Sequence, residues 1–161
     1  MDSKLSLNIE DCHLYPWQQQ IVDDANVWNT RTINLVVDTQ GNNGKSILKT
    51  YVEVHRIGRA IPSCNNYKDI MRTVMNTPKK RLYIIDMPLS INKEKLCNLM
   101  ECIEMIKDGY AYDDRYHFKE EFFDCPNIWV FSNKPFDITY FSLDKWKVWY
   151  INEDKGLCCA V

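Results

Sequence analysis

Hydrophobic residues follow two alternating patterns along the chain. Short apolar runs rich in β-branched and aromatic residues are typical of buried strands, and they occupy residues 33–38, 82–86, 128–133 and 146–151. Between these runs apolar residues recur at helical spacing, which predicts helices over residues 16–28, 46–57, 67–75 and 92–107. Residues 110–124 mix aromatic and charged side chains and predict a hairpin or an exposed loop. Strands that alternate with helices predict an α/β fold, with a mainly parallel sheet flanked by helices.

No repeat, low-complexity stretch or internal linker interrupts this pattern. The 161 residues therefore predict one domain over residues 14–161, after a polar lead-in at residues 1–13. The net charge of −2 excludes a histone-like basic coat but allows a local basic site. No apolar run approaches the roughly 20 residues of a membrane helix, so we expect no membrane partner. Seven cysteines without a C-x-x-C pair favour reduced thiols in a cytosolic or nuclear protein over a zinc site.

The strongest chemical signal is a glycine-containing turn between the first strand and the helix that follows it. The residues of this turn are Gly41, Asn42, Asn43, Gly44, Lys45 and Ser46. Such a loop can turn its backbone N–H groups towards a phosphate, and the helix N-terminus adds its dipole. Lys45 would then neutralise the β- and γ-phosphates, and the Ser46 hydroxyl would ligate Mg²⁺. Thr39 replaces the first glycine of the usual G-x-x-x-x-G-K-[ST] pattern, and the alternative is a plain strand–helix turn.

Two further polar residues follow predicted strands. Asp86 ends the second strand and could serve the metal of a nucleoside-triphosphate site, or it could simply cap a helix or stabilise a turn. Asn133 ends the third strand and could hold the attacking water, or it could form a turn before Lys134 and Pro135. In a parallel sheet, ligands bind at the carboxyl ends of the strands, so both residues are candidates for the same site as the glycine turn.

The order of these motifs resembles the superfamily-3 helicase domain of the replication-initiator (Rep) proteins of small circular single-stranded DNA viruses. The similarity spans roughly residues 14–151 and is carried by six segments: 15–18 (YPWQ), 38–46 (DTQGNNGKS), 83–88 (YIIDMP), 106–109 (IKDG) with Arg115 and Tyr116, 129–133 (WVFSN) and 141–146 (FSLDKW). The glycine turn is the most specific of these segments, and the order and spacing of the others add to it.

The resemblance implies a P-loop ATPase with an AAA+-like core that assembles as a ring, usually a hexamer. Such rings hydrolyse ATP with Mg²⁺ between subunits and move along single-stranded DNA. In that framework Lys45 and Ser46 would bind phosphate and Mg²⁺, Asp86 would serve the metal and the water, and Asn133 would sense the γ-phosphate. The biology of the family also implies a location in the host nucleus; without the resemblance we would expect the cytoplasm.

The resemblance also places a DNA-facing hairpin at residues 107–119. The candidate contacts are Lys107, Arg115, Tyr116, His117 and Lys119. Cations follow a phosphate backbone and aromatic rings stack on bases, a combination that suits sequence-tolerant binding of single strands. The alternative is a solvated, charged hairpin.

Three departures from the family pattern keep other interpretations open. Lys145 stands where relatives commonly carry the arginine finger, and lysine lacks the planar fork of arginine. Asp86 is followed by Met87 and Pro88 rather than by a second carboxylate. Residues 1–30 hold no nicking domain, so the chain is expected to be an excised piece or a free-standing or decayed ATPase module. The alternatives are a nucleotide-binding oligomerisation module with weak or no hydrolysis, and an RNA-acting superfamily-3 relative.

Overall fold

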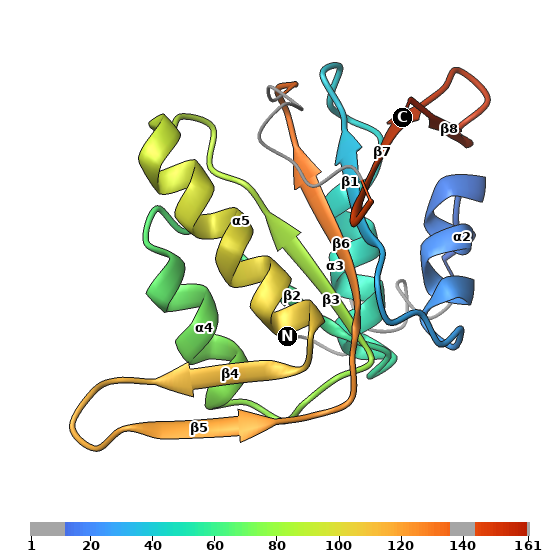
Figure 1. Cartoon of the computed structure of the whole chain (residues 1–161). Helices are drawn as coiled ribbons and strands as arrows, with labels where there is room; N and C mark the ends of the chain where they lie inside the picture. The colour runs from blue at the N-terminus through green and yellow to red at the C-terminus, as the bar shows by residue number, and fades with distance from the viewer. Residues whose placement is uncertain (1–11, 136–143, 161) are drawn as a thin grey trace.

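A six-stranded sheet lies between two layers of helices in the computed structural model, which describes residues 12–135 and 144–160 (Figure 1). The strand order is β2 (Arg59–Ile61), β3 (Leu82–Asp86), β6 (Asn127–Ser132), β1 (Ile33–Val37), β7 (Trp146–Ile151) and β8 (Leu157–Cys159). The first five of these strands are parallel, and β8 runs antiparallel to β7. The predicted α/β architecture with a mainly parallel sheet is therefore confirmed.

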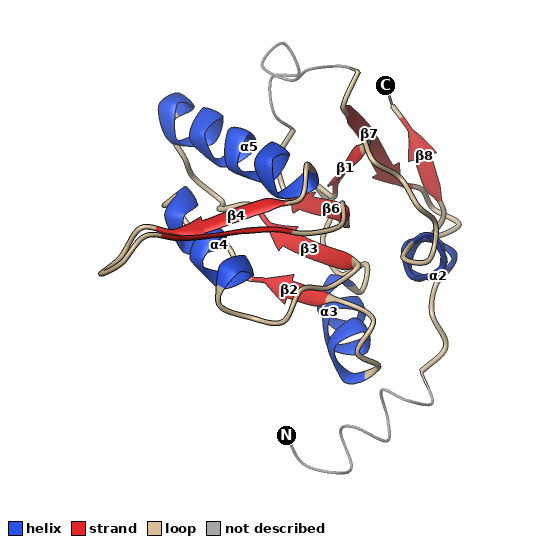
Figure 2. Cartoon of the chain, turned by 60° about the horizontal axis from the view of Figure 1, so that its bottom comes forward, coloured by secondary structure: helices blue, strands red, loops and turns tan. Residues whose placement is uncertain are grey.

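The two faces of the sheet form separate hydrophobic cores. Figure 2 shows the sheet and the helices beside it in a second view. Helices α4 (Tyr67–Met75) and α5 (Lys93–Lys107) cover one face, and α2 (Pro16–Asp24) and α3 (Lys45–Val54) cover the other. Alternation along β1 divides its residues between the cores: Leu35 and Val37 pack under α4 and α5, and Val36 packs with α2 and α3. Because both faces are covered, the parallel strands are apolar without alternation, as the sequence runs indicated.

The strands predicted at residues 33–38, 82–86, 128–133 and 146–151 are all present, within one residue at each end. Two short strands, β2 and β8, were not predicted. Each has three residues and lies at an edge of the sheet, and only Ile61 among the six is fully buried. Pairing with a neighbouring strand therefore decides their conformation, since neither carries a strong apolar pattern of its own.

The first predicted helix is shorter than expected. It ends at Asp24 rather than Trp28, and the Trp28 side chain is 67% exposed instead of lying on the buried stripe. The chain leaves the helix here because Asn127 at the start of β6 donates through Nδ2 to the carbonyls of Asp24 and Val27, at 2.7 and 3.0 Å. A long-range contact thus overrides the local helical spacing.

The helix expected at residues 46–57 also ends early, at Val54, and the glycine after it has a packing reason. A Cβ at Gly58 would lie 2.4 Å from the carbonyl oxygen of Leu82, so only glycine lets the chain pass this close to β3. The third and fourth predicted helices match α4 and α5.

Residues 110–124 form the hairpin that was one of the two expectations. Strands β4 (Tyr110–Asp113) and β5 (Lys119–Phe122) pair antiparallel and project from the sheet at its lower side in Figure 1. All four residues of β5 are exposed, whereas Ala111 and Asp113 of β4 are buried towards α4. Among the described residues, no helix is both long and apolar enough to cross a membrane.

Lys107 corrects one sequence-based assignment, because the structure does not place it on the hairpin surface. It ends α5 and is 2% exposed, and its Nζ donates to the carbonyls of Asn29 and Pro126 at 2.6 and 2.7 Å. The ammonium group therefore joins the α2–β1 connection to the start of β6. Burial lowers the pKa of Lys107 from 10.5 to about 8.

This burial makes the stability of the protein depend on pH. Between pH 8 and 10.5 the folded chain has released the Lys107 proton while the unfolded chain still holds it, so the free energy of unfolding should rise with pH. The gain reaches up to about 3 kcal/mol relative to Lys107→Met, because the methionine variant binds no proton at this position when it unfolds. Urea unfolding of both proteins at several pH values measures it, and parallel profiles would contradict the assignment.

Candidate functional site

Three neighbouring strands bring the predicted site residues to one edge of the sheet. Because β6 pairs with both β1 and β3, the loop after β1, the end of β3 and the residue after β6 come together. A pocket of about 220 Å³ opens between them, lined by Lys45, Ser46, Lys49, Ser63, Asp86, Met87, Leu89, Phe131 and Asn133. The sequence predicted Lys45, Ser46, Asp86 and Asn133, and the structure places all four around this pocket.

The loop between β1 and α3 has an unusual backbone. Gly41, Asn42 and Gly44 all have positive φ, at 73°, 56° and 93°. This left-handed region favours glycine and tolerates asparagine, which matches the residues found. Gly44 is also the N-cap of α3. Loops that combine such residues with a helix N-terminus are able to bind anions through their backbone N–H groups.

Asp38 holds this loop from within. It follows β1 and is 4% exposed, and its Oδ1 accepts hydrogen bonds from Asn43 Nδ2 at 2.8 Å and from the Gly41 backbone N–H at 3.2 Å. Its Oδ2 is buried without a hydrogen-bond partner in the described part of the chain. A buried carboxylate that bonds two loop groups fixes the loop shape before any ligand arrives.

Helix α2 clamps the same loop from outside. Trp17 Nε1 donates to the Asn43 carbonyl at 3.1 Å, and Gln18 Nε2 donates to the Gly44 carbonyl at 2.8 Å. Gln18 lies so close that a Cβ at Gly44 would stand 2.6 Å from its Nε2. The YPWQ segment thus has a local role that the sequence did not reveal, since its partners lie 26 residues away.

A third contact comes from the turn between β7 and β8. Lys155 Nζ donates to Asn43 Oδ1 at 2.5 Å, and the Lys155 carbonyl accepts from the Trp17 backbone N–H at 2.8 Å. The Lys155 ammonium also lies 5.5 Å from the centre of the Tyr15 ring. The loop is therefore joined to both ends of the domain, and Asn43 is the residue where these contacts meet.

Two lysines on α3 bond the polar residues at the ends of β6 and β3 across the pocket. Lys45 Nζ donates to Asn133 Oδ1 at 2.5 Å, and Lys49 Nζ pairs with Asp86 Oδ2 at 2.5 Å. The sequence analysis did not single out Lys49. The available signal was its spacing, because a residue four positions after Lys45 lies on the same face of a helix. The pocket thus presents two cations, one carboxylate and one amide to a ligand.

The donor set suits Mg²⁺ shared with a phosphate rather than held by the protein alone. Within residues 12–135 and 144–160, no three His, Cys, Asp or Glu side chains come together as metal ligands. Mg²⁺ is commonly bound by one or two protein oxygens, with phosphate oxygens and waters completing the octahedron. The Ser46 hydroxyl and the Asp86 carboxylate line the same pocket and could supply those two oxygens. Asp86 is the only carboxylate among the described lining residues.

Lys145 lies at the opposite end of the sheet from the glycine loop. Its carbonyl accepts a hydrogen bond from the Ile33 backbone N–H at the start of β1, whereas the loop follows the end of β1. Five strand residues separate the two ends, a distance of about 16 Å. Lys145 is therefore not part of the pocket of its own chain. Residues 141–143 of the same motif lie outside the described part of the structure.

The remaining hairpin candidates lie far from the pocket, on the β4–β5 projection at the other side of the sheet (Figure 1). Tyr116 is 99% exposed at the tip. Arg115 bonds Asp113 through two nitrogens, at 3.0 and 2.9 Å, which holds the pKa of Asp113 well below its usual range. His117 and Lys119 are exposed beside them.

The contacts of Asp38 predict how the loop will respond to substitution. Asp38→Ala removes two accepted hydrogen bonds and should lower the free energy of unfolding by about 1–3 kcal/mol. Asp38→Asn keeps an acceptor at Oδ1 and removes a buried charge, so its loss should stay within about 1 kcal/mol. Urea unfolding followed by tryptophan fluorescence measures both, with Glu101→Ala on the exposed face of α5 as control. Equal losses in the two Asp38 variants would show that the charge, not the hydrogen bonds, holds the loop.

Comparison with known proteins adds no family to this geometry. No protein-family model matches the chain, and no curated protein matches it significantly. Any activity of this chain must therefore be inferred from its own residues and contacts.

Proposed function

We propose that this chain is a P-loop ATPase with an AAA+-like core, the superfamily-3 helicase domain of a viral Rep-type replication protein. One observation carries the proposal: a glycine loop with three left-handed residues leads into α3, whose first residues Lys45 and Ser46 line one pocket with Asp86 and Asn133. These groups are the ones that binding and hydrolysis of a nucleoside triphosphate require.

Each residue then has a defined task. The loop backbone and Lys45 bind the β- and γ-phosphates, and Lys45 stabilises the negative charge that develops on them. Ser46 and Asp86 would hold Mg²⁺, and the ion would neutralise phosphate charge when bound. Lys49, which pairs with Asp86 at 2.5 Å, adds a second positive charge beside the phosphates. Asn133 orients the attacking water and bonds the γ-phosphate through the amide that now contacts Lys45.

The position of Lys145 supports a shared site between subunits. A cation at the far end of the sheet cannot reach the pocket of its own chain, but it can enter the pocket of a neighbour in a ring. We therefore propose a homo-oligomeric ring, usually a hexamer in the family, with ATP bound between subunits. The exposed β4–β5 hairpin would contact single-stranded DNA through Arg115, Tyr116, His117 and Lys119. The family resemblance alone suggests a host nuclear location.

A second candidate is a nucleotide-binding oligomerisation module that hydrolyses ATP slowly or not at all. The observation that favours it is the lack of a second carboxylate among the described residues of the pocket, together with lysine at position 145. An RNA-acting relative is a third candidate, and competition between single-stranded DNA and RNA for the protein would separate it from the first.

Removing the phosphate-binding cation should abolish hydrolysis. Lys45→Ala is expected to lower kcat by about 100-fold or more, since loss of one group that stabilises transition-state charge costs this much. Steady-state ATPase assays with Mg²⁺, across protein concentration and with single-stranded DNA, measure the effect. Lys95→Ala, at an exposed position of α5, is the matched control. Binding of ATP by a confirmed oligomer without turnover would instead support the oligomerisation module.

Mixing two inactive variants tests whether the site is shared. Lys45→Ala and Lys145→Ala should each be inactive alone, because every interface lacks one cation. When equal amounts of the two variants assemble at random, about one quarter of the interfaces combine an intact Lys45 with an intact Lys145 from the neighbour. About one quarter of the activity should therefore return. A mixture no more active than its components would contradict sharing, and full activity of Lys145→Ala alone would remove Lys145 from the site.

A further inference from the structure

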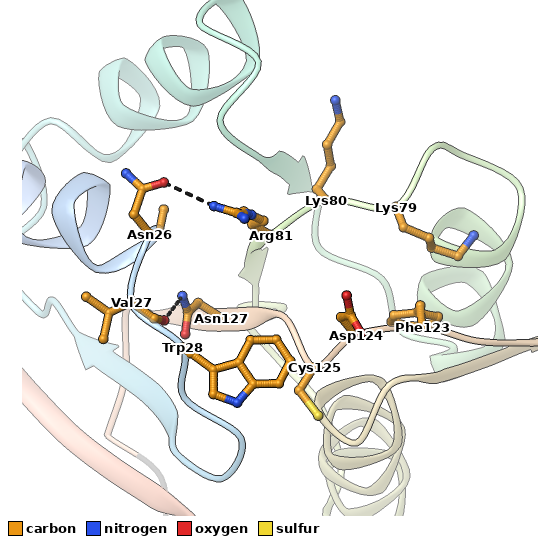
Figure 3. A pocket seen from close by; sticks show the side chains of 11 residues that line it. Asn26, Val27, Trp28, Lys79, Lys80, Arg81, Phe123, Asp124, Cys125 and Asn127 are labelled. Carbon is orange, nitrogen blue, oxygen red and sulfur yellow. Dashed lines mark hydrogen bonds between the residues drawn. The ribbon is translucent and has the colours of Figure 1, made fainter.

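A second pocket lies at the opposite end of the sheet from the proposed ATP site. Its volume is about 530 Å³, larger than the pocket at the glycine loop. It opens where β3 and β6 begin and where the chain leaves the β4–β5 hairpin (Figure 3). Its chemistry combines an exposed aromatic ring, cations and one carboxylate, and none of these groups serves the nucleotide site.

The aromatic ring is the indole of Trp28. It is 67% exposed, whereas Trp17, Trp129 and Trp146 are at most 3% exposed. Its backbone is nonetheless held in place, since Asn127 Nδ2 bonds the carbonyl of the preceding residue, Val27, at 3.0 Å. An exposed indole on a fixed backbone is a ready stacking surface for a planar group.

The cations are Arg81 and Lys80, just before β3. Figure 3 shows Arg81 across the opening from Trp28, whereas the Lys80 side chain extends away from Trp28. Within the described residues neither side chain is paired with a carboxylate, and the only hydrogen bond of the Arg81 guanidinium is a long one of 3.5 Å to Asn26 Oδ1. Lys79 differs, because it pairs with Glu121 at 2.7 Å and lies over the Phe123 ring, so it has a structural role.

We propose that this pocket binds one nucleotide of a single-stranded nucleic acid, with the base stacked on Trp28 and the adjacent phosphate held by Arg81, while Lys80 adds positive charge beside it. Stacking and phosphate contacts of this kind bind single strands without reading sequence. Asp124, which also lines the pocket, can accept a hydrogen bond from a base N–H. The inference rests on the proposed function for the identity of its ligand, but not for its geometry.

Continuity with the hairpin supports a nucleic acid over an acidic peptide. Phe123 and Asp124 line the pocket and directly follow β5, so a strand bound along the hairpin can continue to Trp28. An acidic peptide would gain from the cations but would leave the indole without a planar partner. Binding of such a peptide in place of an oligonucleotide is therefore an outcome that overturns the proposal.

The first experiment measures binding of a fluorescent oligothymidylate by anisotropy at several salt concentrations. Trp28→Ala should weaken binding by about 5- to 150-fold, the range found for loss of one base–aromatic stack. Arg81→Gln should reduce the slope of log K against log salt by about 0.7, because it removes one phosphate contact to a single strand. Both side chains are exposed, so neither substitution should unfold the chain. Lys95→Gln removes one charge elsewhere and should leave the slope unchanged.

The second experiment reads the pocket directly. Oligothymidylate should quench the tryptophan fluorescence of the wild-type chain, and Trp28→Phe should lose that quenching while it keeps most of the affinity through its own ring. Quenching that survives in Trp28→Phe, or unchanged affinity and salt slope in both Trp28→Ala and Arg81→Gln, would overturn the pocket assignment.

The experiments distinguish a wrong assignment of this pocket from a wrong proposed function. If Tyr116→Ala and Lys119→Ala weaken oligonucleotide binding but the Trp28 and Arg81 variants do not, the pocket assignment is overturned, whereas the strand binding at the hairpin that the proposed function expects is supported. If the Trp28 and Arg81 variants weaken oligonucleotide binding but the wild-type chain does not hydrolyse ATP, the pocket assignment stands and the proposed ATPase activity is contradicted. If the wild-type chain binds only an acidic peptide, such as polyglutamate, and no oligonucleotide, the pocket assignment is overturned.

Discussion

The pairing of β6 with both β1 and β3 is the constraint on which the chemistry of this chain depends. It places the residue after β6 between the glycine loop and Asp86, so that Asn133 can bond Lys45 while Lys49 bonds Asp86 across the same pocket. Parallel pairing also directs all three carboxyl ends to one edge. If β6 did not lie between β1 and β3, Asn133 would not lie between the glycine loop and Asp86.

The glycine loop is held by more contacts than its own sequence suggests. Asp38 bonds it from beneath, Trp17 and Gln18 clamp it from α2, and Lys155 reaches Asn43 from the C-terminal hairpin. A loop with three left-handed residues is conformationally costly, and these contacts stabilise it. Preorganisation of this kind reduces the ordering that a phosphate ligand would otherwise have to induce.

The two ends of the sheet carry different kinds of chemistry. The carboxyl end holds the compact group of Lys45, Lys49, Asp86 and Asn133, in which each cation already has a polar partner. The amino end holds the hairpin, Lys145 and the pocket at Trp28, where cations and aromatic rings are spread over a broad surface. Our proposals assign hydrolysis to the first end, and strand binding and the contribution to a neighbouring subunit to the second.

The sequence by itself determined the layered α/β class, all four helices to within a few residues and the strands that are buried on both faces. It could do so because local hydrophobic spacing encodes burial. It also selected Lys45 and Ser46 from the glycine turn before a helix, and Asp86 and Asn133 because polar residues that follow buried parallel strands meet at one edge. Only the tertiary structure decided the rest. Lys107 is buried and bonds the carbonyls of Asn29 and Pro126. Trp28 is exposed because helix α2 ends before it, where Asn127 bonds the carbonyls of Asp24 and Val27. The clamp on Asn43 and the pairing of β2 and β8 likewise join residues far apart in the chain, and no local pattern encodes such contacts.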